Sequence, residues 1–204
     1  SIVTLVGGEP LIREDFPDIL YKVSKTTFRK VNVVSNGLLI NDEIIKTFIK
    51  SRLLLLSVSL DGFSKTHDKN RGKDGVFETV ITNLENMNKQ KYRPMIDMKT
   101  IVLENNLDDL PKLYKLCTDM KFNYFSLSFL RNNNLKQNSV LHDRFIEDFN
   151  GNYPVKKYFD LEHFAEVYKE IESMSKKSGV KIRFSPKFEY CNNPLQAILY
   201  FFKR

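Results

Sequence analysis

The sequence predicts an α/β fold built from repeated βαβ units around a parallel sheet, and three features of the 204-residue chain lead to this prediction. Short apolar runs of strand length alternate with amphipathic stretches of helical period. The order is strand, helix, strand, helix almost throughout, which favours right-handed crossovers between parallel strands. Most of the apolar runs also stop at a polar or glycine-containing segment. We therefore expect one α/β domain whose sheet is either open or closed into a barrel.

Six apolar runs have the length and composition of buried strands. They are rich in Val, Ile, Leu and Phe and mostly lack polar alternation, which is typical of parallel strands that are covered on both faces. The expected strands are IVTLV from Ile2, VNVVS from Val31, LLLLSVSL from Leu53, MIDMKTIVL from Met95, YFSLSFL from Tyr124 and VKIRF from Val180. A further apolar run, ILYFF from Ile198, lies close to the C-terminus.

Five amphipathic stretches place apolar residues three and four positions apart, so each is expected to bury one face of a helix. These helices are DFPDILYKVSK (15–25), NDEIIKTFIK (41–50), VFETVITNLENMNK (76–89), LDDLPKLYKLCTDM (107–120) and LEHFAEVYKEIESMSKK (161–177). The segment HDKNRGKDG (67–75) is expected to be a loop. The Asn-rich stretch 131–154 is also expected to be a loop, with at most one short helix around 142–149.

Charge and composition narrow the possible functions. The net charge is +7, but the basic residues are spread over nearly every expected helix, so a dedicated nucleic-acid surface is disfavoured and RNA binding is only an alternative. No apolar stretch approaches the ~18 residues of a membrane span, and no secretory leader is visible, so a cytoplasmic location is expected. The two cysteines, Cys117 and Cys191, are not expected to form a disulfide or to hold a metal cluster by themselves.

Five of the expected strands end in polar or glycine-rich segments. They are Gly7-Gly8-Glu9-Pro10, Ser35-Asn36-Gly37, Ser59-Leu60-Asp61-Gly62, Glu104-Asn105-Asn106 and Arg131-Asn132. A parallel sheet brings these segments to its C-terminal edge, where α/β folds place their active sites. The segments supply acceptors for an ammonium group and for ribose hydroxyls. No GxGxxG or GKS/GKT loop is present, so phosphate-based nucleotide binding is disfavoured.

Four other residues have weaker signals. His67 and Arg71 are expected to be solvated or to form a structural salt bridge rather than to act in catalysis. Asp97, in the middle of the fourth strand, is expected to face the inside of the sheet, where a buried acid needs a partner. Cys117 shares a helix face with apolar residues and is expected to be a small buried hydrophobe.

Several of these motifs together resemble the core of radical S-adenosylmethionine (SAM) enzymes. They are GGEP (7–10), SNG (35–37), VSLDG (58–62), HDKNRGKDGVFETV (67–80) and IVLENNLDDL (101–110). More narrowly, their order resembles the peptide- and protein-modifying enzymes that carry an additional SPASM or twitch domain. The resemblance covers about residues 1–130. It implies a partial (β/α)6 TIM-like barrel that lacks its first βα unit.

The resemblance implies cofactor-binding roles for six residues: Gly7, Gly8, Glu9, Asn36, Ser59 and Asp61. In the family, the GGEP motif binds the amino group of SAM, which corresponds to Gly7, Gly8 and Glu9 here. Ser59 and Asp61 match positions that approach the ribose and the substrate, and Asn36 matches the amide of the family's TNG motif.

One part of the family pattern is absent. The CxxxCxxC loop that holds a [4Fe–4S] cluster does not occur in this sequence, so we expect a fragment of a longer enzyme. The expected divisions are 1–131 for the partial barrel, 132–185 for an Asn-rich loop, helix and strand that extend it, and 186–204 for the start of a SPASM- or twitch-like segment. Cys191 would be an auxiliary cluster ligand in that segment.

The resemblance also implies an activity. The parent enzyme would cleave SAM reductively at its [4Fe–4S] cluster and abstract hydrogen from a peptide or small organic substrate, with electrons from an external donor. The chain alone is expected to be inactive. The alternative is a barrel without a cluster that binds a peptide or another partner.

Overall fold

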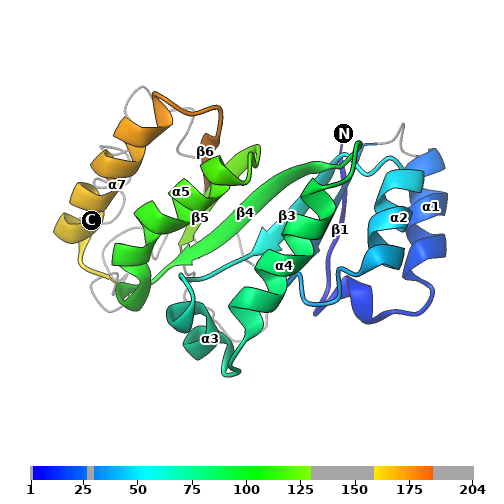
Figure 1. Cartoon of the computed structure of the whole chain (residues 1–204), viewed down its shortest axis with the longest axis horizontal. Helices are drawn as coiled ribbons and strands as arrows, with labels where there is room; N and C mark the ends of the chain where they lie inside the picture. Colours follow the sequence, from blue (N-terminus) through cyan, green and yellow to red (C-terminus); the bar gives the residue numbers. More distant parts are fainter. Residues whose placement is uncertain (1, 27–29, 130–158, 186–204) are drawn as a thin grey trace, which may run out of the picture.

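The computed structural model describes residues 2–26, 30–129 and 159–185, and these form one open sheet with helices packed on it (Figure 1). The six strands are β1 (Val3–Leu5), β2 (Val31–Ser35), β3 (Leu55–Ser59), β4 (Met95–Val102), β5 (Tyr124–Phe129) and β6 (Lys181–Ser185). All neighbouring strands are parallel, and the strand order follows the chain from β1 to β6. The predicted α/β fold with a parallel sheet is therefore confirmed, and the sheet is open.

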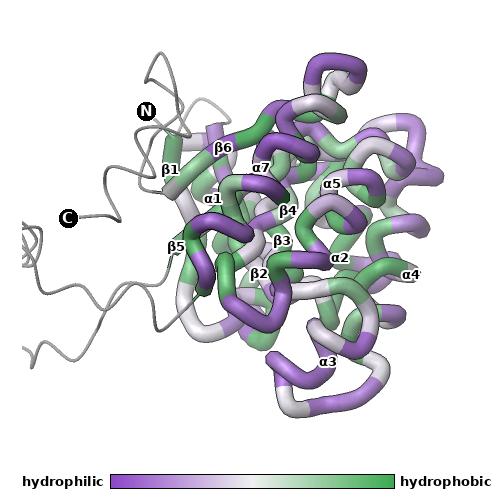
Figure 2. The backbone as a smooth tube through the Cα atoms, turned by 90° about the vertical axis from the view of Figure 1, so that its left-hand side faces the viewer, coloured by the Kyte–Doolittle hydropathy of each residue, from purple (hydrophilic) through white to green (hydrophobic). Residues whose placement is uncertain are grey.

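Helices follow the strands in the predicted order. They are α1 (Phe16–Thr26), α2 (Asp42–Lys50), α3 (Lys65–Arg71), α4 (Val76–Asn88), α5 (Leu110–Asp119) and α7 (Leu161–Ser175), with short 3-10 turns η1 (Pro10–Ile12) and η2 (Glu104–Asp109). Asn41 caps α2 by accepting a hydrogen bond from the Ile44 amide at 3.0 Å, and Asp160 caps α7 in the same way. Figure 2 shows the strands toward one side of the molecule and α2, α4 and α5 toward the other.

The core lies between the sheet and these helices. Every helix except α3 contributes buried apolar side chains, among them Leu20, Phe48, Val80, Leu113 and Phe164. Alternate strand residues meet them from the sheet, including Val33, Leu56, Met98 and Leu127. Burial of this apolar surface at roughly 25 cal/mol per Å² is the main force that stabilises the two layers.

Two details differ from the sequence prediction. Residues 65–71 form helix α3, although 67–75 was expected to be a loop. Strands β3 to β5 do alternate, with polar residues such as Ser57, Asp97 and Ser126 on the face opposite the helices. The alternation was concealed because the face opposite the helices also carries apolar residues, such as Leu55, Met95 and Ile101.

Some expectations fall outside the described residues. They concern the short helix at 142–149, the strand end Arg131-Asn132, the ILYFF strand, the segment 186–204 and Cys191. The division of the chain at 131 and 185 stays a prediction. Among the helices that the structure describes, none is long and apolar enough to cross a membrane.

Candidate functional site

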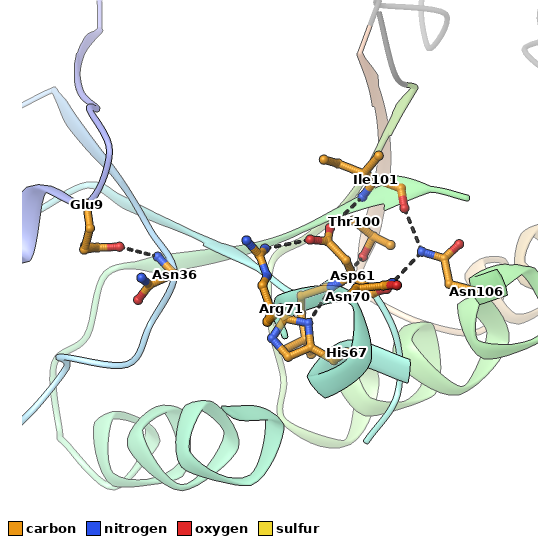
Figure 3. Close-up of polar contacts among 10 residues, drawn as sticks. Glu9, Asn36, Asp61, His67, Asn70, Arg71, Thr100, Ile101 and Asn106 are labelled. Atoms are coloured by element: carbon orange, nitrogen blue, oxygen red, sulfur yellow. Dashed lines mark hydrogen bonds and ion pairs between the residues drawn. The ribbon is translucent and has the colours of Figure 1, made fainter. Parts of the chain in front are cut away.

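Four of the five polar strand ends lie together at the C-terminal edge of the sheet. Because β1 to β4 are parallel, the segments that follow Leu5, Ser35, Ser59 and Val102 all leave the sheet on the same side. The predicted clustering of polar groups is thus confirmed for the described strand ends. Figure 3 shows two groups of contacts there, one around Glu9 and one around Asp61.

Glu9 joins the end of β1 to the end of β2. Its Oε1 accepts hydrogen bonds from the Leu11 amide at 3.1 Å and from the Ser35 hydroxyl at 2.9 Å. Its Oε2 accepts a bond from the Asn36 amide at 2.6 Å (Figure 3). An ionised carboxylate offers about four acceptor positions, so these three donors leave one position on Oε2 for a ligand. Glu9 is therefore fixed in place and still has an acceptor to offer.

The backbone around Glu9 is suited to close approach by a ligand. Gly7 and Gly8 are exposed, and a Cβ atom added to either would meet nothing within 4 Å. In the following turn of β2, the Asn36 Oδ1 accepts a bond from the Leu38 amide at 3.0 Å. The Asn36 side chain is thereby oriented, and its own N–H donors have no acceptor among the described residues.

The carboxylate of Asp61 is held by two partners. Its Oδ2 lies 2.6 Å from a guanidinium nitrogen of Arg71, and its Oδ1 accepts a bond from the Ile101 amide of β4 at 3.0 Å. Asp61 is only 7% exposed. These contacts give Asp61 a structural role, and the ribose or substrate role that was expected for it stays a prediction.

The backbone of Asp61 is also fully engaged. Its N–H donates to Nδ1 of His67 at 2.9 Å, and its carbonyl accepts from the side-chain amides of Asn70 at 2.8 Å and Asn106 at 3.0 Å (Figure 3). This residue therefore ties together β3, α3 and η2. Ser59, by contrast, is half-buried at the end of β3, and its hydroxyl makes no hydrogen bond among the described residues.

Arg71 forms the expected salt bridge, with Asp61. Helix α3 also brings its guanidinium to the polar edge, where the side chain remains 33% exposed, so Arg71 is a further candidate site residue. It faces the same edge as Glu9 (Figure 3). The spacing of four residues between His67 and Arg71 was the available signal, because it places both on one face of a helix.

His67 is buried beneath this edge as a neutral imidazole. It is 1% exposed, its Nδ1 accepts from Asp61, and its Nε2 has no partner among the described residues. Burial lowers the pKa of His67 from 6.5 to about 4, and the positive charge of Arg71 acts in the same direction. His67 therefore binds a proton less readily in the folded chain than in the unfolded chain.

This pKa shift predicts a loss of stability in acid. As pH falls from about 6.5 to about 4, the unfolded chain binds a proton at His67 that the folded chain does not, and the free energy of unfolding falls by about 3 kcal/mol. Below about pH 4 this contribution stops changing. His67→Asn keeps an acceptor for the Asp61 amide but does not titrate, so urea unfolding at several pH values should show a flatter profile. Identical slopes in both proteins would contradict this.

The described residues do not form an iron–sulfur site. Cys117 is completely buried, its Sγ lies 3.6 Å from Sδ of Met98, and burial raises its pKa well above the usual range, which keeps it a thiol. Cluster ligands are thiolates. No group of three or more His, Cys, Asp or Glu residues that could hold a metal occurs in the part of the chain that the structure describes. With two cysteines in all, this chain does not fit a cluster held by three thiolates.

An apolar cavity of about 670 Å³ lies away from these strand ends. It is lined by residues at the end of α2 and by residues that precede β3 and β4, among them Phe48, Leu53, Tyr92 and Pro94. These positions belong to the N-terminal edge of the sheet. The cavity is therefore separate from the polar edge that carries Glu9 and Arg71.

The chain is similar to several curated enzymes. An AdoMet-dependent heme synthase of Methanosarcina barkeri is 32% identical over 130 residues, which cover 63% of this chain and 36% of that protein. A cysteine-type anaerobic sulfatase-maturating enzyme of Clostridium novyi is 33% identical over 127 residues, which cover 58% of this chain and 33% of that protein. The chain thus spans about a third of the length of the curated relatives it matches.

A solved structure shares the fold. Streptococcus suis SuiB, in a crystal structure with bound S-adenosylmethionine, gives a TM-score of 0.64 at 17% identity and covers 89% of this chain and 39% of that one. SuiB has also been crystallised with its precursor peptide SuiA, where the TM-score is 0.61. The model of the radical SAM superfamily matches residues 1–117. Because this match includes more than half of the chain and both GGEP and the Asp61 loop, the protein belongs to the radical SAM superfamily.

Proposed function

We propose that this chain holds the amino-acid part of S-adenosylmethionine for a radical SAM enzyme that modifies a peptide or a small organic molecule. The observation that carries the proposal is the Glu9 carboxylate, which three donors fix at the strand-end edge and which keeps one acceptor position open. An ammonium group is a strong donor to such an oxygen. The expected roles of Gly7, Gly8 and Asn36 belong to the same proposal.

The rest of the edge suits the remaining groups of SAM. Arg71 offers the positive charge that the carboxylate of SAM needs, since its side chain is partly exposed beside Asp61. The hydroxyl of Ser59, which makes no hydrogen bond among the described residues, suits a ribose hydroxyl. In this superfamily SAM supplies radical chemistry after it receives one electron, and a [4Fe–4S] cluster is characteristic of that chemistry. The residues of this chain bind and orient SAM but do not supply the cluster.

The relatives support the proposed substrate class. They include a sulfatase-maturating enzyme, a heme synthase and, as a structural neighbour, a protein crystallised with its precursor peptide. These names support a peptide or a small organic molecule as substrate. The external electron donor and the cytoplasmic location expected from the sequence stay predictions.

Calorimetric titration of the 204-residue chain tests the proposal. SAM and S-adenosylhomocysteine carry the amino-acid group, whereas 5′-methylthioadenosine lacks it. We expect both amino-acid ligands to bind at least about tenfold more tightly than 5′-methylthioadenosine, because each charge-assisted hydrogen bond contributes roughly 1.5–3 kcal/mol. Equal affinity for all three ligands would refute the proposed role of Glu9 and Arg71.

A further inference from the structure

The face of the sheet opposite the helices carries two rows of polar residues that are in register across four strands. The row nearer the strand ends is Ser59, Lys99, Ser126 and Arg183. The row one pleat below it is Ser57, Asp97, Tyr124 and Lys181. In-register residues of parallel strands, and residues two apart on one strand, share a face. All eight positions therefore lie on the face opposite the helices, which we call the inner face.

This composition is unusual for the face that a parallel α/β sheet turns away from its helices, which lines the inside when such a sheet closes into a barrel. Interiors that only pack are filled with Val, Ile and Leu. Here apolar residues such as Val58, Met98 and Leu127 are on the helix side, and the opposite face carries Leu55, Met95 and Ile101 only above and below the two polar rows. Three cations and one carboxylate occupy the inner rows instead, which indicates a surface for an anionic ligand.

Asp97 lies in the lower row of this surface, and the hydrogen-bond partners of its carboxylate are mainly hydroxyl groups. Its Oδ1 accepts a hydrogen bond from Ser126 at 2.6 Å, and the Ser57 hydroxyl lies 3.4 Å from Oδ2. The side chain is 3% exposed, and burial raises the pKa of its carboxyl. A guanidinium nitrogen of Arg183 lies 4.0 Å from Oδ2, which is too long for a hydrogen bond. The buried acid at this position thus has partners, as the sequence led us to expect.

The guanidinium of Arg183 is positioned by stacking, and its N–H donors are not used by the described residues. Its guanidinium carbon lies 3.2 Å from the centroid of the Tyr124 ring, an arrangement that fixes the plane of the group. The side chain is 38% exposed, and it has no hydrogen-bond acceptor among the described residues. A planar guanidinium with free donors is the group that best matches a carboxylate, because it can bind both oxygens.

Lys99 supplies a second cation at the same level. It lies two strands from Arg183, on the other side of Ser126, so their Cα atoms are about 10 Å apart. Side chains of this length can converge on one anion above Ser126. Lys99 is half-buried and has no acceptor among residues 30–129 or in the other described ranges.

We propose that Arg183 and Lys99 bind a carboxylate of the substrate. This inference rests on the proposed function, because the row lies on β3 to β6 near the C-terminal edge of the sheet, and Glu9 and Arg71 would hold SAM at that same edge. A carboxylate fixed there would place the attached carbon chain beneath the cosubstrate. The substrate is then an acid, either a small organic acid or a peptide with an acidic side chain.

Nuclear magnetic resonance titration of the isotope-labelled chain tests this inference. N-acetylglutamate amide represents an acidic peptide side chain, glutarate a small organic acid, and N-acetylglutamine amide is the neutral control of equal shape. We expect the two acids, but not the neutral probe, to shift amide signals of β4, β5 and β6. The acid that binds more tightly identifies the source of the carboxylate.

Matched variants assign the binding to the inner row. Arg183→Gln and Lys99→Gln should each weaken binding of the preferred acid about tenfold. Lys46→Gln makes the same change at an exposed position of α2 and should have no effect. Equal binding of charged and neutral probes, no shifts up to the solubility limit, or an equal loss in Lys46→Gln would overturn the inference.

Titration of the same variants with SAM separates the two proposals. A chain that binds SAM but does not prefer the acidic probes refutes only the carboxylate site. A chain that binds the acidic probes but not SAM refutes the proposed function. If Arg183→Gln or Lys99→Gln weakens SAM binding about tenfold, the cations serve the cosubstrate, and the inference is overturned.

Discussion

Replacement of Gly62 by alanine is expected to destabilise the fold by roughly 3 kcal/mol or more. Gly62 has φ +157°, and an added Cβ would lie 2.6 Å from Cγ2 of Thr66 and 2.9 Å from the backbone nitrogen of His67. These contacts cannot be relieved by rotating a flexible side chain, because they involve the Cβ-branched Thr66 and the backbone of His67 in helix α3. The alanine therefore has to displace helix α3, and Arg71 is displaced with it.

Thermal and urea unfolding measure this effect. For a chain of this size the loss corresponds to a decrease in Tm of roughly 6 °C or more. Gly179→Ala is the matched control, since a Cβ there meets nothing within 4 Å and the residue has no positive φ. A Gly62→Ala protein as stable as the Gly179→Ala protein would show that α3 does not constrain this turn.

Glu9→Gln is expected to weaken SAM binding at least about tenfold while binding of 5′-methylthioadenosine changes little. The amide cannot accept on both of its ends, so its NH2 group must face the donor of either Ser35 or Asn36. The negative charge for the ammonium group is lost at the same time. Both effects act on the amino-acid part of the ligand.

Calorimetry with the two ligands separates these effects from a general disturbance of the loop. Glu14→Gln removes an exposed carboxylate from the same segment and should leave both affinities unchanged. If Glu9→Gln lowers both affinities equally, or neither of them, then Glu9 acts only as the cap of η1 and the proposed ammonium contact is wrong.

The regular elements could be predicted because their patterns are local. The helix beginning at Asp42 has an Asn cap, an apolar stripe and a Lys at its end, all within ten residues. Helix α3 lacks such a stripe, and His67 is its buried residue. It is held by tertiary contacts, such as those of Asp68 with the Gly75 and Phe77 amides, that composition does not reveal. Its charged, glycine-flanked sequence therefore resembled a loop.

The gathering of polar strand ends could be predicted from the sequence, but their contacts could not. The polar strand ends indicated a common edge, because parallel strands share it. The partners of Glu9 are 26 and 27 residues away, so its role in joining β1 to β2 depends on strand order. The inner rows depend on register as well, since Lys99 and Arg183 share a row only because both pair with Ser126.

The most direct test of the central claim is to locate bound SAM on the chain by nuclear magnetic resonance. The glycine amides are convenient reporters because they lie at both edges of the sheet. We expect SAM to shift Gly7, Gly8, Gly37 and Gly62, which follow β1, β2 and β3, and to leave Gly179, which precedes β6, unchanged. Shifts at Gly179 without shifts at Gly7 and Gly8, or no shifts at all, would contradict the assignment of the SAM site to this edge.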